Sequence, residues 1–291
     1  PDVPEDTPKR EIKSVAVIGA GTMGGGISMN FLNAGIPVKM LETKQEALDR
    51  GVATIRKNYE AQVKKGKLKQ DKYEQRMALL STTLSYDDIA QADLVIEAVF
   101  EDLGVKEKVF SQLDAIAKSG AILASNTSTL SITEIAAGCK RPDKVVGMHF
   151  CLPAQLMKLI EMSPGILTSD ETFKSAWDWT LAAGQTPVKT QDKPGFILNA
   201  LLVPFNNDAI RAVEARVADV VKRMFGGDDW KVTLRRTVAL PDAQGPGKRK
   251  VTTSGSYGVT PPSLPRGGWN NFFANVATGV KCARRCGGRP R

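Results

Sequence analysis

Short apolar runs rich in β-branched residues alternate with helically spaced apolar residues over the first two thirds of the chain. The run at residues 15–18 is followed by apolar side chains at helical spacing over residues 22–34, and then by a second apolar run over residues 36–41. This order predicts a strand, a helix and a parallel strand. The alternation continues with apolar runs at residues 92–99, 121–125 and 145–150 and helical patterns at residues 104–117 and 131–137. We therefore predict a doubly wound, mostly parallel α/β sheet.

A charged helical stretch interrupts this alternation after the second strand. It covers residues 45–66, breaks near Gly66 and continues as a helix over residues 70–80, which predicts a helical hairpin insertion. Pro194 and Gly195 mark a boundary, and an apolar helix is expected from Phe196 to Val213. The expected parts are a linker-like N-terminus, the sheet domain, the start of a helical C-terminal domain and an atypical basic segment, at residues 1–13, 14–194, 195–214 and 215–291.

The composition is that of a globular protein, but the charge is divided unevenly. The 291-residue chain has 42% hydrophobic and 24% charged residues. No apolar run reaches the roughly 18–20 residues that a membrane helix needs. Residues 1–214 hold 25 basic and 27 acidic residues, whereas residues 215–291 hold 15 and 4, so the net charge of +9 comes from the end of the chain. We therefore expect no nucleic acid partner for the sheet domain.

Residues 215–291 are open to two interpretations. They contain no Glu, 11 glycines and 6 prolines, as a shifted reading frame in a GC-rich gene would produce. The alternative is a basic tail that binds nucleic acid or anionic lipid, with Trp230 and Trp269 available for stacking. Cys282 and Cys286 have no second pair of metal ligands nearby in the sequence, so no metal site is expected.

Gly19, Gly21 and Gly24 form a G-x-G-x-x-G turn between the first predicted strand and the first helix. In a dinucleotide-binding turn the first glycine allows the tight bend, the second lets the backbone approach a pyrophosphate, and the third permits close helix packing. Glu42 ends the second strand 18 residues after Gly24, where its carboxylate would accept hydrogen bonds from the adenosine ribose. The predicted fold is therefore Rossmann-like. An acidic residue disfavours the 2′-phosphate of NADP, so NAD is the predicted cofactor, with NADP kept as an alternative by Lys44.

The single histidine of the chain, His149, lies at the end of the predicted strand at residues 145–150. Side chains at the carboxyl ends of parallel strands face the crevice that holds the ligand. Oxidation of an alcohol needs a base for the hydroxyl proton, and an imidazole suits that task. Glu161 follows 12 residues later in a strand-like segment that could run back beside the first, where its carboxylate would pair with His149. The alternative is a structural histidine at a strand end.

Five motifs follow one another within residues 10–214. They are VAVIGAGTMGGG from Val15 to Gly26, ADLVIEAVFE from Ala92 to Glu101, ASNTSTL from Ala124 to Leu130, GMHFCLPAQLMKLIE from Gly147 to Glu161, and PGFILNALLV from Pro194 to Val203. Together they resemble the L-3-hydroxyacyl-CoA dehydrogenases. The resemblance implies NAD-dependent oxidation of L-3-hydroxyacyl-CoA to 3-ketoacyl-CoA in fatty-acid β-oxidation. Residues 7–12 resemble the linker that precedes this domain in multifunctional β-oxidation enzymes.

The resemblance also implies roles for individual residues. His149 would be the catalytic base and Glu161 its orienting partner, while Ser128 and Asn199 would hydrogen-bond the 3-oxygen of the substrate. The cofactor-binding residues would be Gly19, Gly21, Thr22, Met23, Gly24, Glu42, Glu101, Lys106 and Asn126. Glu101 would lie with Lys106 by the nicotinamide ribose.

Several of these residues have simpler alternatives. Ser128 could cap a helix over residues 129–137, and Asn199 could be a polar anchor within a helix. The lysine-rich hairpin at residues 57–69 would bind the phosphates of coenzyme A according to the resemblance, whereas charge runs on helices are commonly a solvated face.

The chain departs from the family's pattern near these residues. Leu152 stands where the family usually has Asn or Ser and cannot make a hydrogen bond, and Ala200 stands where Arg is common. Nothing from residue 215 onward resembles the family's helical domain, which dimerises and covers the substrate. The alternatives are a catalytically weak or inactive NAD-binding protein, and a hydroxyacid dehydrogenase that does not use CoA esters.

The cysteine content bears on the compartment. Four cysteines are too few for a disulfide-built scaffold in a chain of this length, which favours a reducing compartment. We expect the cytoplasm, with the peroxisome as the alternative. The expected substrate is an acyl-CoA, and the expected assembly is a homodimer or part of a longer multifunctional chain, without a membrane span.

Overall fold

The computed structural model describes residues 3–225, 231–235, 256–260, 273–275 and 281–282. The chain divides into two compact units, Pro1–Ala200 and Leu201–Arg291. The first unit carries every residue that the sequence analysis selects for catalysis or cofactor binding.

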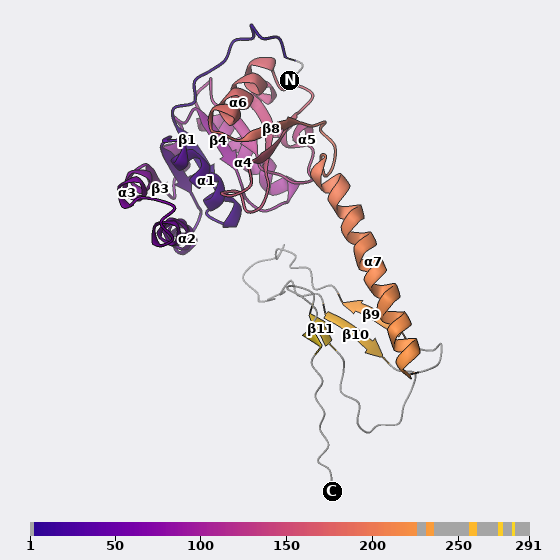
Figure 1. Ribbon diagram of the computed structural model, residues 1–291. Helices are drawn as coiled ribbons and strands as arrows, with labels where there is room; N and C mark the ends of the chain where they lie inside the picture. The colour runs from indigo at the N-terminus through magenta and orange to yellow at the C-terminus, as the bar shows by residue number, and fades with distance from the viewer. Residues whose placement is uncertain (1–2, 226–230, 236–255, 261–272, 276–280, 283–291) are drawn as a thin grey trace. The chain divides into compact units, whose positions relative to one another are not determined.

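An eight-stranded sheet forms the centre of the first unit (Figure 1). Its strands are β1 (Val15–Ile18), β2 (Val38–Leu41), β3 (Leu80–Thr83), β4 (Leu94–Glu97), β5 (Ile122–Ser125), β6 (Val145–Phe150), β7 (Leu159–Pro164) and β8 (Thr186–Lys189). They lie in the order β3-β2-β1-β4-β5-β6-β7-β8. Strands β1 to β6 are parallel, whereas β7 runs antiparallel to β6 and parallel to β8. The order reverses at β1, next to β4, where doubly wound sheets bind their ligands.

Helices cover both faces of this sheet. They are α1 (Thr22–Asn33), α2 (Gln45–Lys64), α3 (Gln70–Ala78), α4 (Leu103–Ile116), α5 (Ile132–Ala136) and α6 (Asp170–Ala182), with short 3₁₀ segments η1 (Tyr86–Ile89) and η2 (Pro142–Lys144). Neighbouring residues of β1 face opposite sides: Val17 belongs to one apolar cluster with Phe31 of α1, and Ile18 to another with Phe110 of α4. Trp179 of α6 stacks on Phe31 with ring centroids 4.0 Å apart, so α1 and α6 share a face. Burial on both faces explains the continuous apolar runs in the sequence.

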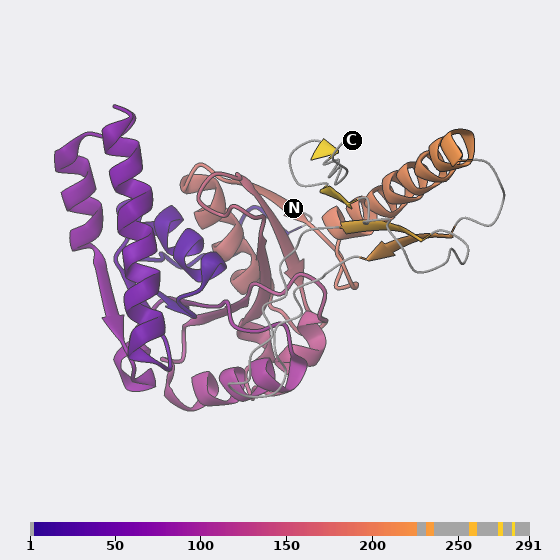
Figure 2. The ribbon, with the colours of Figure 1, turned by 90° about the horizontal axis from the view of Figure 1, so that it is seen from below.

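The predicted helical hairpin is formed by α2 and α3, beside the β3 edge of the sheet (Figure 2). Helix α2 ends at Lys64, and Gly66 follows with a φ of +68°, in the left-handed region that favours glycine. The N–H groups of Gly66 and Lys67 return to carbonyls of the last turn of α2. Tyr59 is fully buried, and its hydroxyl donates to the Oδ1 of Asn33 at 3.0 Å, so the hairpin is anchored on α1.

The structure confirms the doubly wound, mostly parallel sheet with an inserted helical hairpin. It also contains elements that the apolar pattern did not indicate, namely β3, α6 and β8. Strand β3 has the sequence LSTT, which contains no apolar run, because the strand is partly exposed and two of its side chains face solvent. Helix α6 begins at a cap in which the Ser169 hydroxyl accepts from the Thr172 N–H at 3.2 Å.

The second unit contains most of a long helix and a small sheet. Helix α7 (Leu198–Phe225) begins within the first unit and continues twelve residues beyond the predicted end at Val213. The strands β9 (Lys231–Arg235), β10 (Ser256–Thr260), β11 (Phe273–Asn275) and β12 (Lys281–Cys282) pair antiparallel in the order β12-β11-β10-β9. The aromatic side chains Trp230 and Trp269 and the thiol of Cys286 lie outside the described residues.

Within the part of the chain that the structure describes, we find no helix with the combination of length and apolar character needed to cross a membrane.

The packing of α1 on β1 gives a direct test of the turn. A Cβ on Gly24 would lie 1.8 Å from the carbonyl oxygen of Gly19, so we expect Gly24→Ala to lower the free energy of unfolding by about 3 kcal/mol or more. Gly25→Ala is the matched control, because its Cβ would meet Ile55 at an ordinary 3.7 Å. That change should be neutral or stabilise the helix by up to about 1 kcal/mol. Urea unfolding followed by circular dichroism measures both, and equal midpoints for the two variants would contradict the packing argument.

Candidate active site

The glycine turn lies at the carboxyl end of β1. Gly19 has a φ of +106°, and a Cβ there would lie 2.7 Å from the carbonyl oxygen of Ala98, so this residue must be glycine to pack against the end of β4. Apart from Gly21 and its two neighbours in the chain, no atom of the protein packs within 4 Å of the position that a Cβ on Gly21 would take. That open backbone, at the N-terminus of α1, fits the close approach of an anionic phosphate.

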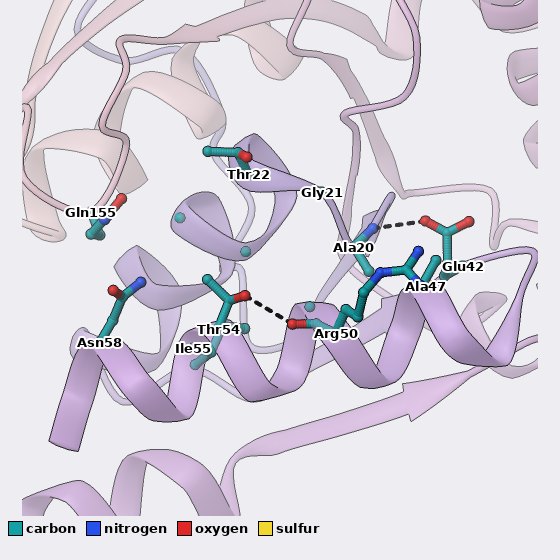
Figure 3. A pocket seen from close by; sticks show the side chains of 13 residues that line it. Ala20, Gly21, Thr22, Glu42, Ala47, Arg50, Thr54, Ile55, Asn58 and Gln155 are labelled. Carbon is teal, nitrogen blue, oxygen red and sulfur yellow. Dashed lines mark hydrogen bonds between the residues drawn. The ribbon is translucent and has the colours of Figure 1, made fainter. Parts of the chain in front are cut away.

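A cavity of about 560 Å³ adjoins the turn (Figure 3). Thr22 lines it from α1, and Met23 is half-buried and packs against the apolar core. Glu42 and Arg50 lie at one end of the cavity, and Asn58 lies at the other. The volume is in the range of small-molecule sites. Arg50 adds a positive charge that sequence analysis did not select, because one basic residue on a charged helix gives no distinct signal.

Glu42 is held at the end of β2, facing the glycine turn. Its Oε2 accepts from the backbone N–H of Ala20 at 3.1 Å, and its Oε1 accepts from the N–H of Thr43 at 2.7 Å. The carboxylate therefore joins the end of β2 to the turn between β1 and α1. Because two oxygens offer about four acceptor positions, it can also accept from ribose hydroxyls.

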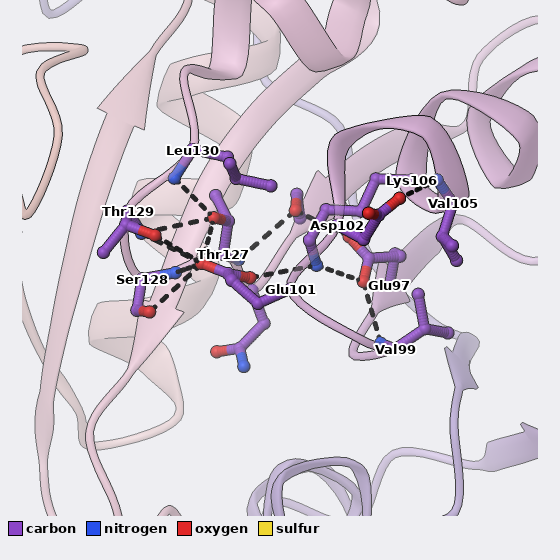
Figure 4. A network of polar contacts seen from close by, with 12 residues as sticks. Glu97, Val99, Glu101, Asp102, Val105, Lys106, Thr127, Ser128, Thr129 and Leu130 are labelled. Atoms are coloured by element: carbon purple, nitrogen blue, oxygen red, sulfur yellow. Dashed lines mark hydrogen bonds and ion pairs between the residues drawn. The ribbon is translucent and has the colours of Figure 1, made fainter. Parts of the chain in front are cut away.

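A buried ion pair lies at the carboxyl end of β4 (Figure 4). Glu97 is 0% exposed and Lys106 is 1% exposed, and the Nζ of Lys106 lies 2.6 Å from the Oε1 of Glu97. The Ser125 hydroxyl donates to the other oxygen of Glu97 at 2.7 Å, and the Val99 N–H donates to Oε1 at 2.8 Å. These bonds compensate the loss of hydration that a buried pair suffers. Sequence analysis did not select Glu97, although a carboxylate inside an apolar strand is itself a signal.

Glu101 connects this pair to the loop that follows β5. Its Oε2 lies 3.4 Å from the Nζ of Lys106, and its Oε1 accepts from the Thr127 hydroxyl at 2.7 Å and from the N–H groups of Ser128 and Thr129 at 2.8 and 3.0 Å. Burial alone would raise the pKa of Glu101, but the hydrogen bond from Thr127 and the charge of Lys106 outweigh it and lower the pKa. Glu101 is therefore ionised at neutral pH and holds the loop in place.

Asn126 links the ends of β5 and β6. Its N–H donates to the carbonyl of Glu97 at 2.9 Å, and its Oδ1 accepts from the N–H of Phe150 at 2.9 Å. Asn126, which the resemblance assigns to cofactor binding, thus lies between the buried pair and the strand that carries the histidine.

His149 and Glu161 lie opposite each other in the antiparallel pair β6–β7. The Nδ1 of His149 is 2.7 Å from the Oε2 of Glu161, and the residues are 8% and 2% exposed. A carboxylate that accepts from Nδ1–H assigns the proton of the neutral ring to Nδ1 and leaves Nε2 as the basic nitrogen. The Oε1 of Glu161 accepts from the N–H groups of Ile197 and Leu198 at 2.9 and 2.8 Å. The pairing predicted from the sequence is therefore present in the fold.

Ser128 and Asn199 also lie together. The Nδ2 of Asn199 donates to the carbonyl of Ser128 at 3.3 Å, and the Ser128 hydroxyl donates to Glu101 at 3.1 Å. The helix cap suggested as the alternative role of Ser128 belongs to Ser131, whose hydroxyl accepts from the Glu134 N–H at 3.3 Å. That alternative is wrong because α5 begins only at Ile132.

Two further features border this site. Leu152, which departs from the family's pattern, is 63% exposed in the loop after β6. The lysines at residues 57–69 of the α2–α3 hairpin are exposed, and none of them is in an ion pair within the described part of the chain; they are Lys57, Lys64, Lys65, Lys67 and Lys69. The hairpin therefore presents unneutralised positive charge to solvent.

The sequence of this chain is similar to those of known proteins. The family described as "3-hydroxyacyl-CoA dehydrogenase, NAD binding domain" matches residues 14–193. Over 196 residues, 67% of this chain and 70% of the relative, the chain is 43% identical to 3-hydroxybutyryl-CoA dehydrogenase of Clostridioides difficile. It is 40% identical over 196 residues to the fatty acid oxidation complex subunit alpha of Idiomarina loihiensis, but this match covers 27% of that longer protein.

The fold is also similar to solved structures. The crystal structure of (S)-3-hydroxybutyryl-CoA dehydrogenase PaaH1 from Ralstonia eutropha matches with a TM-score of 0.69 and 35% identity, over 73% of this chain and 77% of that chain. The match to an NAD-binding domain confirms the predicted cofactor, NAD.

The lowered pKa of Glu101 predicts a dependence of stability on pH. A carboxyl group whose pKa is lower in the folded than in the unfolded chain stabilises the fold above its ordinary value of 4.5, and loses this effect as the pH falls through its folded value. Glu101→Gln should therefore be less stable than the parent by roughly 1–3 kcal/mol at pH 7. The difference should narrow as the pH falls below 4.5.

Urea unfolding at pH 7, 5 and 3.5 measures this difference. Glu5→Gln, at an exposed position, is the control and should show no gap at any pH. A gap for Glu101→Gln that stays constant down to the lowest pH would show that the charge of Glu101 is not what holds the loop.

Proposed function

We propose, because this chain belongs to the 3-hydroxyacyl-CoA dehydrogenase family, that it oxidises an L-3-hydroxyacyl-CoA to the 3-ketoacyl-CoA with NAD. The observation that carries the proposal is the 2.7 Å contact between His149 and Glu161. This pair lies at the same edge of the sheet as the glycine turn, where parallel strands end. Base and cofactor would therefore meet the substrate from one crevice.

His149 would act as the base. Its Nε2 takes the proton of the 3-hydroxyl group, while the hydride leaves C3 and the carbon–oxygen bond becomes a carbonyl. Bound NAD supplies the acceptor for this hydride. Glu161 keeps the proton of the neutral ring on Nδ1 and stabilises the imidazolium that forms. In the reverse direction, the same imidazolium returns its proton to the 3-oxygen.

Ser128 and Asn199 would bind the 3-oxygen of the substrate. The Nδ2 of Asn199 uses one N–H for the carbonyl of Ser128 and has a second to donate. The Ser128 hydroxyl, now bonded to Glu101, can rotate toward a substrate oxygen. Donors at this position stabilise negative charge that develops on the oxygen as its proton is removed.

The positive α2–α3 hairpin supports a coenzyme A ester rather than a free acid. The five exposed lysines at residues 57–69 would attract the phosphates of coenzyme A, and Asn58 of α2 lines the cavity. We further propose a place in fatty-acid β-oxidation, which the similarity to a fatty acid oxidation complex subunit supports. The second candidate, an NAD-binding protein with weak or no activity, is favoured by the exposed apolar Leu152 near the end of β6.

Acetoacetyl-CoA and NADH test the reaction in the reverse direction. We expect NADH oxidation, followed by absorbance, and a rate lower by about 10²–10⁴ for His149→Ala, because that variant lacks the proton donor. NADH binding, measured by fluorescence, should be the same for both proteins. Equal rates would contradict the role of His149, and NADH binding without any turnover would favour the non-catalytic candidate.

Charge reversal tests the hairpin. Lys65→Glu with Lys67→Glu should raise KM for acetoacetyl-CoA by about tenfold at low salt, because two attractive charges become repulsive. The effect should weaken at high salt. KM for NADH should not change. Lys140→Glu, an exposed lysine outside the hairpin, is the control. A faster reaction with free acetoacetate than with acetoacetyl-CoA would instead support a hydroxyacid dehydrogenase.

A further inference from the structure

The segment that joins β8 to α7 has an unusual backbone. Gly195 has a φ of +80°, and Phe196 follows it with a φ of +48°. Phe196 is the one residue other than glycine with a positive φ in the part of the chain that the structure describes. Side chains as bulky as Phe rarely adopt this left-handed conformation, and such residues persist where surrounding contacts require them.

The contacts of Phe196 explain what its backbone achieves. The side chain is buried, 7% exposed, and belongs to the same apolar cluster as Val145 of β6 and Ile132 of α5. Its ring centroid lies 5.7 Å from that of His149, with an angle of 42° between the two planes. The imidazole is therefore in contact with Phe196 as well as with Glu161.

The two residues after Phe196 complete the arrangement. The N–H groups of Ile197 and Leu198 both donate to the Oε1 of Glu161, the oxygen that does not contact His149. These groups are at the start of α7, where N–H groups have no partner within the helix and favour a negative charge. Both oxygens of Glu161 are thus engaged, and the carboxylate is restrained from turning away from the histidine.

We propose that Phe196 is a positioning residue for His149 and Glu161. Its left-handed backbone directs the ring onto the imidazole and, at the same time, the next two N–H groups onto the carboxylate. Replacement of the ring would let the imidazole tilt, and the Nδ1–H···Oε2 bond would lengthen. The positioning effect on catalysis rests on the proposed dehydrogenase function, whereas the effect on the hydrogen bond does not.

The substitution Phe196→Asn distinguishes the effect of the aromatic ring from that of the backbone conformation. Asn tolerates the left-handed conformation better than other residues with a side chain, so Phe196→Asn keeps the chain path and removes the ring. Phe196→Tyr keeps the ring and is the conservative variant. Phe173→Leu in α6 is the matched control, because it also removes a buried ring (2% exposed) from the first unit but at a distance in sequence and in another apolar cluster.

The single histidine makes a spectroscopic test specific. In the full-length chain labelled with ¹⁵N-histidine, every imidazole signal arises from His149. We expect a low-field Nδ1–H resonance in the parent chain, in Phe196→Tyr and in Phe173→Leu. In Phe196→Asn the resonance should move upfield or be lost to exchange with solvent. If Phe196→Asn does not fold, as judged by circular dichroism, Phe196→Leu takes its place with the same expectation.

Kinetics with acetoacetyl-CoA and NADH give the second readout. For Phe196→Asn we expect kcat to fall by about 10–100-fold with KM for both substrates within about twofold, because the base is misplaced while the binding surfaces remain. Phe196→Tyr should retain kcat. An unchanged Nδ1–H resonance in the substituted chain would overturn the proposal, whatever happens to the rate. If the unsubstituted chain has no activity but Phe196→Asn still changes the Nδ1–H resonance, the positioning role is supported and the dehydrogenase function is rejected.

Discussion

The ion pair between Glu97 and Lys106 is the interaction on which the geometry of the site depends. It is removed from water at the point where β4 ends, so each charge needs the other, and the structure around them is constrained to keep both paired. Lys106 in turn holds Glu101, which holds the loop at residues 127–129. The carbonyl of Ser128 in that loop accepts from Asn199, at the beginning of α7. A chain of polar contacts thus extends from the end of β4 to the helix that meets Glu161.

The reversal of direction at β7 gives this network its chemical use. In a sheet that was parallel throughout, the residues beside the end of β6 would belong to the carboxyl end of the neighbouring strand. A crossover connection would then separate those residues from β6 in the sequence. Because β7 runs antiparallel, its first residues lie next to the last residues of β6, and Glu161 is directly opposite His149. The dyad is therefore built into the pairing register of two strands and does not depend on a mobile loop.

The parts of the fold that depend on local pattern could be predicted from the sequence. The glycine turn, the strands β1, β2 and β6 and the opposition of His149 and Glu161 follow from apolar runs and from the short spacing between the two strands. Glu97 was not selected because its partner, nine residues later, lies on a helix whose position depends on tertiary packing. The conformation of Phe196 likewise depends on its contact with His149 of β6 rather than on its neighbours in sequence. Strand β3 has no apolar run that would indicate it.

The first turn of α7 has one further consequence, for how the chain can vary in length. An α-helix turns by about 100° with each residue, so a single residue inserted between Gly195 and Leu198 would rotate the first N–H groups away from Glu161. The same insertion after the first turn would leave those groups where they are, because only the N–H groups at the start of α7 contact Glu161. An insertion or deletion between Gly195 and Leu198 would therefore disturb the site, whereas a change in the length of α7 beyond its first turn would not.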